Sequence, residues 1–200
     1  LSMQGLKRLL TKPVLLPILS ALLMAAAFPP YSAWALCFVA LVPLFLTLFE
    51  AQTLKQAAVR SAIMGIAIVY TGFYWVGDVA VNFGGLPWIV GKIVLVVFSL
   101  FGEMQFLFAG IGIFLMMRAF PRSRVLWIVG IPTIYTGVDF LFPKIFPNSL
   151  GHGLHGWFSL AQLVEYTGVS GLTFLMLASN GIIALRLSKK IDKVLAAKAM

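Results

Sequence analysis

Long apolar runs alternate with short polar segments along this chain of 200 residues. A helix that crosses a membrane needs about 20 predominantly apolar residues, so the pattern predicts membrane-spanning helices joined by short connections. We therefore expect an all-α integral membrane fold, a bundle of about six transmembrane helices that forms a single domain over residues 1–200. The expected spans are residues 13–28, 33–49, 61–76, 88–117, 125–142 and 168–187.

Proline and glycine mark the breaks between these spans. Pro29 and Pro30 are expected to end the first span, because neither ring nitrogen can donate to a helical ladder. Gly84-Gly85 followed by Pro87 predicts a tight turn before a helix that begins near Trp88. Residues 143–165 are rich in proline and glycine, and this composition predicts an irregular or re-entrant segment.

Composition and charge agree with a membrane protein. The chain is 61% hydrophobic and 10% charged, whereas a soluble domain carries about 25% charged residues. The net charge of +9 would suit nucleic-acid binding, but the basic residues come in small clusters between apolar runs, so we expect no nucleic-acid partner.

The positions of these clusters predict the topology. Thirteen of the 15 Lys and Arg residues fall in the amino terminus, in residues 50–60 and 118–124, and in the carboxyl tail. Because basic residues concentrate on the cytoplasmic side, both termini are predicted to be cytoplasmic. The connections at 29–33, 76–87 and 143–167 are then expected outside.

The stretch from Tyr74 to Trp88 is too polar for hydrocarbon, since it carries Asp78, Asn82, two glycines and a proline. We expect a loop at the outer membrane surface, where aromatic rings with one polar edge collect. The loop is either an anchoring aromatic belt or a docking surface for a lipid or lipopeptide. The docking candidates are Tyr74, Trp75, Phe83, Gly84, Gly85 and Trp88.

Ionisable groups inside the predicted spans are costly, so Glu103 and Asp139 are candidate polar sites. Glu103 would face a polar cavity or proton path, or would hydrogen-bond a neighbouring helix. It lies roughly 16 Å along the helix from Lys92, too far for direct pairing. Asp139 lies near the outer end of its span, where Lys144 or water could partner it.

The residues alone predict no catalytic group, metal or cofactor. His152 and His155 are three residues apart but have no acidic or cysteine ligand close by, so metal binding is weakly indicated. The single cysteine, Cys37, lies inside an apolar run and is expected to be a buried core residue. The sequence has no GxxxxGK[ST] motif, no GxGxxG motif after a predicted strand, no GxSxG elbow and no HExxH motif.

The run AFPPYSAWALCFVALVPLFL, residues 27–46, resembles the first hairpin of bacterial apolipoprotein N-acyltransferases. Further similarities follow in order along nearly the whole chain. They comprise Gly65 with Gly72, Tyr74-Trp75-Val76, Phe83-Gly84-Gly85-Leu86-Pro87, Phe146-Pro147, Leu150-Gly151, Gln162-Leu163, the run from Tyr166 to Leu175, and Asn180.

The resemblance implies an inner-membrane protein of lipoprotein maturation. The family transfers an acyl chain from phospholipid to the amino-terminal diacylglyceryl-cysteine of apolipoproteins, through a cysteine thioester in a nitrilase-like domain that follows the membrane helices. This sequence ends after the sixth expected span, so we expect lipid or lipoprotein binding without catalysis, with the catalytic domain separate or missing. Two departures from the family pattern are Asn148, where a tryptophan was expected, and Asp139, where the family has a glutamate.

An alternative of similar size and topology is a small six-span substrate-binding subunit of a membrane transporter. Length and topology fit both alternatives equally well. The ordered set of motifs favours the acyltransferase family.

Overall fold

The computed structural model describes residues 3–146 and 148–188, with side chains from Lys12 onward. Every regular element in these residues is helical, which confirms the predicted all-α class for them. The elements are α1 Met3–Ala27, η1 Trp34–Phe38, α2 Val42–Glu50, α3 Leu54–Gly72, α4 Trp75–Asn82, α5 Trp88–Phe101, α6 Gln105–Ala119, α7 Arg124–Leu141, η2 Leu150–Gly156, α8 Phe158–Ala161 and α9 Val164–Leu187.

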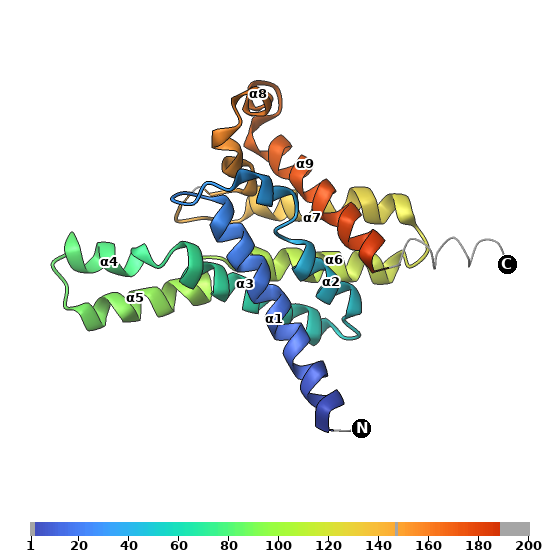
Figure 1. Ribbon diagram of the computed structural model, residues 1–200, viewed down its shortest axis with the longest axis horizontal. Helices are drawn as coiled ribbons and strands as arrows, with labels where there is room; N and C mark the ends of the chain where they lie inside the picture. Colours follow the sequence, from blue (N-terminus) through green and yellow to red (C-terminus); the bar gives the residue numbers. More distant parts are fainter. Residues whose placement is uncertain (1–2, 147, 189–200) are drawn as a thin grey trace.

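Two long, interrupted helices form the middle of the fold. α3 and α4 follow each other with a bend of 51°, and α5 and α6 run back beside them. α1 packs along α3, and α7 packs against both α6 and α9. Figure 1 shows the α4–α5 hairpin projecting away from the remaining helices as an arm.

Among the described residues, fewer helices are long and apolar enough to cross a membrane than the six predicted. Three qualify, namely Trp88–Ala119, Arg124–Leu141 and Val164–Leu187, and the bent pair α3–α4 would make a fourth. The first predicted span corresponds to a shorter apolar helix, Lys12–Ala27. The second is divided into η1 and α2, because Pro43 stands in the first turn of α2 and has no N–H to continue a helix through it.

Side chains from α1 and α9 hydrogen-bond to backbone N–H and C=O groups at the junction between η1 and α2. Asn180 Oδ1 accepts a hydrogen bond from the Leu41 N–H at 2.8 Å, and Asn180 Nδ2 donates to the Cys37 carbonyl at 2.8 Å. Ser20 Oγ accepts from the Leu44 N–H at 2.8 Å. Non-helical backbone is tolerated at membrane depth only where such partners exist, so Asn180 joins α9 to the broken segment.

The prediction of an outer loop at residues 76–87 is wrong over most of that range, because Trp75–Asn82 is helical. Only residues 83–87 connect α4 to α5, which begins at Trp88 as predicted. Gly77 and Gly91 allow the two helices of this arm to touch, since a Cβ on Gly77 would lie 2.8 Å from the Gly91 carbonyl oxygen. This contact between two backbones holds α4 against α5. The polarity of the individual residues does not predict it.

The segment predicted to be irregular before the last span also contains short helices. η2 and α8 lie within it, and α9 already begins at Val164. The backbone of α9 nevertheless breaks at Gly168, with φ 65° and ψ 178°. The continuous part of α9 therefore starts where the sequence placed the span, at a residue that adopts positive φ without steric cost.

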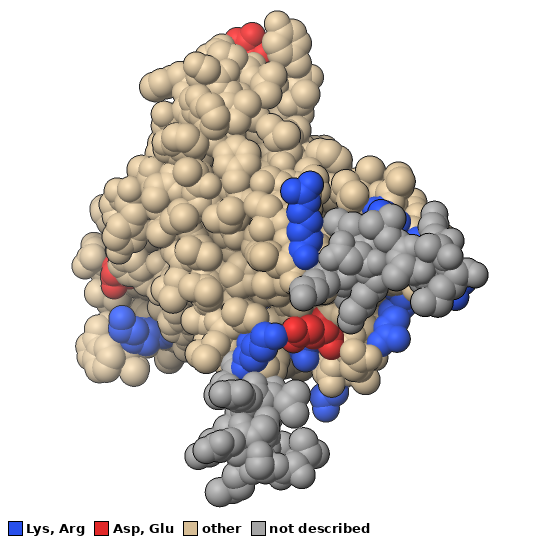
Figure 2. Space-filling model, turned by 45° about the vertical axis from the view of Figure 1, so that its right-hand side comes forward, with Lys and Arg blue, Asp and Glu red and all other residues tan. Residues whose placement is uncertain are grey.

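Basic side chains from α1, α3 and α6 bond to α2 and to the connection that follows it. Lys12 Nζ pairs with Glu50 Oε1 at 2.7 Å, and Arg118 Nη2 donates to the Gln52 carbonyl at 2.7 Å. Arg60 donates to the Thr47 carbonyl nearby. Figure 2 shows most of the visible Lys and Arg residues on the lower part of this face, whereas the upper end, which carries α8, shows none.

Candidate functional site

A pocket of about 200 Å³ lies between the ends of α1 and α3. We call it the Trp75 pocket. Its wall is apolar except for Asn148, so it suits a hydrocarbon group with one polar contact. The lining residues are Met24, Ala25, Phe28, Pro29, Ile68, Gly72, Phe73, Trp75 and Asn148.

Four aromatic rings cluster at the base of the α4–α5 arm, and two of them, Phe73 and Trp75, line this pocket. The Phe146 ring centroid lies 5.1 Å from that of Trp75, 5.8 Å from Phe98 and 6.3 Å from Phe73. Trp75 Nε1 donates to the Gly72 carbonyl at 3.2 Å, which fixes the indole at the start of α4. Offset and edge-on ring pairs add to apolar burial, so Phe146 fastens its loop to α3 and α5.

Glu103 lies at the break between α5 and α6, and only 2% of the residue is exposed. Gln105 Nε2 donates to Glu103 Oε2 at 2.7 Å, and Asn148 Nδ2 donates to Glu103 Oε1 at 3.2 Å. Both roles predicted for Glu103 stay open, because Glu103 makes these hydrogen bonds and also lines a pocket of about 120 Å³ between α3 and the α5–α6 break. Its long-range partner is a loop, however, and not a neighbouring helix.

Asp139, near the end of α7, pairs with Lys144, the partner suggested by the sequence. Lys144 Nζ lies 2.6 Å from Asp139 Oδ1, and the exposed fractions of the two side chains are 9% and 3%. Ser149 Oγ donates to Asp139 Oδ2 at 2.6 Å. Lys144 also donates to Ser149 Oγ at 3.2 Å and to the Asn148 carbonyl. The ammonium and the carboxylate therefore both have additional hydrogen bonds, as a buried ion pair requires.

These contacts hold the connection between α7 and η2 from two sides. Glu103 binds it from the α5–α6 break, and the Asp139–Lys144 pair binds it from α7. The same connection carries Phe146 to the aromatic cluster and Asn148 to the Trp75 pocket. The buried charges thus position the pocket wall, although they do not themselves line it.

The six docking candidates named from the sequence do not form one surface. Tyr74 and Trp75 lie where α3 meets α4, whereas Phe83, Gly84, Gly85 and Trp88 lie at the far end of the arm. The remaining seven residues of α4, 76–82, separate the two groups, so that Phe83 lies about 12 Å from Trp75 along the helix at 1.5 Å per residue. Of the six, Trp75 alone lines the Trp75 pocket. The four at the tip are exposed, with 87% of Phe83 and 67% of Trp88 accessible.

Several residues of the pocket wall were missed from the sequence. Phe28 and Phe73 are ordinary apolar residues of their spans, and Asn148 was noted only as a departure from the family pattern. The sequence carried one signal of this wall: the polar residues Lys144, Asn148 and Ser149 lie close to Asp139 along the chain.

The two histidines contact different parts of the protein, His152 within its own turn and His155 at the distant Ser32. His152 Nδ1 accepts from the Ser149 N–H at 3.0 Å, and His155 Nε2 lies 3.4 Å from Ser32 Oγ. Within residues 3–146 and 148–188, no three His, Cys, Asp or Glu side chains gather as metal ligands would. Cys37 is fully buried.

Residues 20–182 match the family described as the apolipoprotein N-acyltransferase N-terminal domain. The chain belongs to this family. The match includes every residue of the Trp75 pocket and of the Glu103 and Asp139 networks, and it confirms the resemblance seen in the sequence motifs. It favours the acyltransferase family over a transporter subunit.

Full-length relatives carry this N-terminal domain as one part. The chain is 28% identical over 173 residues to the apolipoprotein N-acyltransferase of Geobacter metallireducens, covering 84% of this chain and 32% of the relative. It is 29% identical over 197 residues to that of Chlorobaculum tepidum, covering 93% and 34%. With the Vibrio cholerae enzyme it is 30% identical over 166 residues, covering 79% and 31%. The chain thus spans about a third of the length of these relatives.

Proposed function

We propose that this chain acts in bacterial lipoprotein maturation as the membrane domain of an apolipoprotein N-acyltransferase-like protein. The reaction it would serve transfers an acyl chain from phospholipid to the amino-terminal diacylglyceryl-cysteine of an apolipoprotein. The family match over residues 20–182 carries this proposal. Phospholipid and diacylated apolipoprotein are then its partners, and the bacterial inner membrane is its location.

In this proposal the chain crosses the membrane six times and both termini are cytoplasmic. The basic residues that bond to the end of α2 and to the connection after it support that orientation, because Lys and Arg concentrate on the cytoplasmic side. Trp88–Ala119 has 32 residues, about 48 Å of helix against a hydrocarbon core of about 30 Å. The excess length would let the α4–α5 arm extend beyond the core on the outer side.

The Trp75 pocket would hold part of an acyl chain. Each buried methylene contributes about 0.8 kcal/mol, so three or four methylenes against Phe28, Phe73 and Trp75 would give a useful affinity. The volume of about 200 Å³ is too small for a whole diacylglyceryl group. The Asn148 amide would offer a hydrogen bond to an ester or hydroxyl oxygen at the end of that chain.

The described residues would bind without catalysing acyl transfer. A thioester mechanism needs an activated nucleophile beside a base. The only cysteine in the sequence, Cys37, is fully buried and lies against Gly153. Triacylated product, formed from phospholipid and a diacylated lipopeptide by this chain and also by its Cys37→Ala variant, would contradict this part of the proposal.

Crosslinking tests the docking role. The protein, inserted in lipid nanodiscs, would be exposed to a diacylated lipopeptide that carries a diazirine in one acyl chain. Trp75→Ala removes one side of the Trp75 pocket. Gly72→Leu fills the pocket, and its Cβ meets only ordinary contacts with Ile68 at 3.5 Å and Ala25 at 3.9 Å.

Both variants should crosslink several times less lipopeptide than the unmodified chain. Trp88→Ala, which removes an exposed tryptophan at the far end of the arm, is the matched control and should crosslink normally. Equal crosslinking in all three variants would leave the aromatic residues with an anchoring role only.

A further inference from the structure

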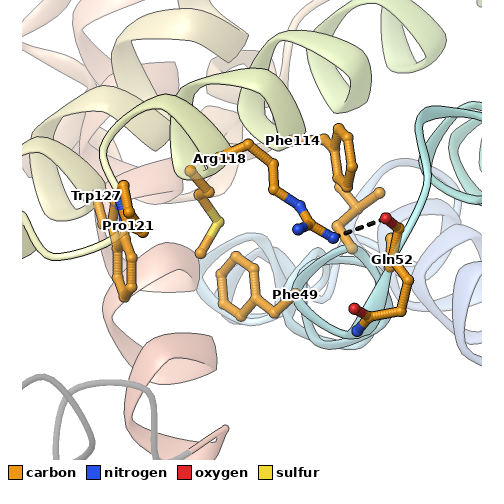
Figure 3. Close-up of a pocket in the computed structure, with 9 residues that line it drawn as sticks. Phe49, Gln52, Phe114, Arg118, Pro121 and Trp127 are labelled. Carbon is orange, nitrogen blue, oxygen red and sulfur yellow. Dashed lines mark hydrogen bonds between the residues drawn. The ribbon is translucent and has the colours of Figure 1, made fainter.

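A second pocket, of about 220 Å³, lies at the basic end of the bundle, between the ends of α2 and α6 and the start of α7. We call it the Arg118 pocket. Figure 3 shows Arg118 reaching from α6 toward Gln52, with Phe49, Pro121 and Trp127 around the same space. Its lining residues are Leu48, Phe49, Ala51, Gln52, Phe114, Met117, Arg118, Pro121 and Trp127.

Arg118 is held in place by two contacts. Its Nη2 donates to the Gln52 carbonyl at 2.7 Å, and its guanidinium carbon lies 5.3 Å from the centre of the Phe114 ring. A guanidinium has five N–H donors, so a hydrogen bond to one carbonyl leaves capacity for the oxygens of a phosphate. The side chain is exposed, and it can therefore meet a ligand from outside the protein.

The rest of the wall is apolar and well fixed. Trp127 is buried, and its Nε1 donates to the Phe120 carbonyl at 2.8 Å, which orients the indole. Phe49, Met117 and Leu48 complete the apolar part. A ligand that fits this pocket therefore combines a charged head with an apolar body.

The electrostatic surroundings favour an anion. Arg122, in the connection to α7, and Arg124, the first residue of α7, follow Arg118. Glu50 at the end of α2 is the one described carboxylate at this end of the bundle, and it is paired with Lys12 at 2.7 Å. The other described carboxylates lie on α4, at the α5–α6 break, near the end of α7 and at the start of α9.

We propose that the Arg118 pocket binds an anionic membrane phospholipid, with the headgroup phosphate on the Arg118 guanidinium and the first part of an acyl chain against Phe49, Met117 and Trp127. Basic pockets between membrane helices on the cytoplasmic side are suited to such headgroups. The volume is smaller than the roughly 300–1,000 Å³ of a drug-sized site, so the remainder of the lipid would stay in the bilayer. The proposal needs only the membrane placement of α6 and α7, and it is independent of a role in lipoprotein maturation.

Native mass spectrometry of the whole chain tests the site. Delipidated protein would receive phosphatidylglycerol or phosphatidylcholine with identical acyl chains. The unmodified chain should retain phosphatidylglycerol about fivefold better, the effect expected for one basic side chain near an anionic lipid. Arg118→Gln should abolish the preference, whereas Lys92→Gln, which changes an exposed lysine on α5 away from this pocket, should keep it.

A second variant separates lipid binding from the structural hydrogen bond to Gln52. Ala51→Leu fills the apolar part of the pocket while Arg118 remains, and it should also reduce phosphatidylglycerol retention. If both Arg118→Gln and Ala51→Leu retain the full preference, the proposal is wrong. It is also wrong if inorganic phosphate at millimolar concentration displaces phosphatidylglycerol as well as unlabelled phosphatidylglycerol does, since the site would then take a free phosphate.

Discussion

Replacing Lys144 by Met should destabilise the protein strongly. The Asp139 and Lys144 side chains are 3% and 9% exposed and 2.6 Å apart, so Lys144→Met leaves a buried carboxylate without its cation. Removing one partner of a buried ion pair costs about 3–5 kcal/mol. The variant also loses the Lys144 hydrogen bonds to the Asn148 carbonyl and to Ser149 Oγ. We therefore expect the free energy of unfolding to fall by at least about 3 kcal/mol.

A double-mutant cycle in mixed detergent micelles measures this effect. Equilibrium unfolding would be compared for Lys144→Met, Asp139→Asn and the two together. The double variant should regain much of the loss, because the neutral amide introduced by Asp139→Asn no longer needs a cation and its carbonyl can still accept from Ser149. Lys92→Met, at an exposed lysine on α5, is the control and should change stability by less than about 0.5 kcal/mol.

Two results would refute this reasoning. The first is a loss below about 1 kcal/mol for Lys144→Met, which is the range of an exposed pair. The second is a double variant as unstable as the sum of the single variants, which would mean that the two charges do not depend on each other.

Three further predictions concern topology and packing. In intact cells, a cysteine at Asn82 should react with a membrane-impermeant thiol reagent and one at Ser188 should not, because both termini are predicted to be cytoplasmic; the reverse pattern would contradict the orientation. Asn180→Leu should lower the free energy of unfolding by about 2–5 kcal/mol, since buried backbone groups of η1 and α2 lose their partner, and a loss below about 1 kcal/mol would show that water replaces it. Gly91→Leu should speed hydrogen exchange of the α4 amides, because its Cβ would lie 2.6 Å from the Gly77 carbonyl oxygen; unchanged exchange would mean that the arm adapts without separating.

Much of the helix pattern could be predicted from the sequence, because apolar length and proline position act locally. α1 ends at Ala27, just before Pro29, and α5 begins at Trp88 after Pro87. α4 could not be predicted in this way. Asp78 and Asn82 indicated a loop, whereas the helix is held by the contact of Gly77 with Gly91, which depends on how two helices cross.

In the candidate site, too, some contacts could be predicted from the sequence and others depend on how the helices pack. Asp139 and Lys144 are five residues apart, so their pairing could be anticipated from the chain. Glu103 and Asn148 are 45 residues apart, and their hydrogen bond depends on the full packing of α5, α6 and α7. The Trp75 pocket combines the ends of α1 and α3 with that distant loop, and no local pattern marks it.

The most direct test of the central claim is to map where a lipoprotein acyl chain rests on this protein. A diacylated lipopeptide with a diazirine in its acyl chain would be photolysed with the nanodisc-embedded chain, and the labelled residues identified by peptide mass spectrometry. Docking in the Trp75 pocket predicts label on residues 24–29 and 68–75, lost when unlabelled lipopeptide is added in excess. Label spread over the exposed apolar faces of all helices, or confined to residues 83–88 at the tip of the arm, would contradict the account.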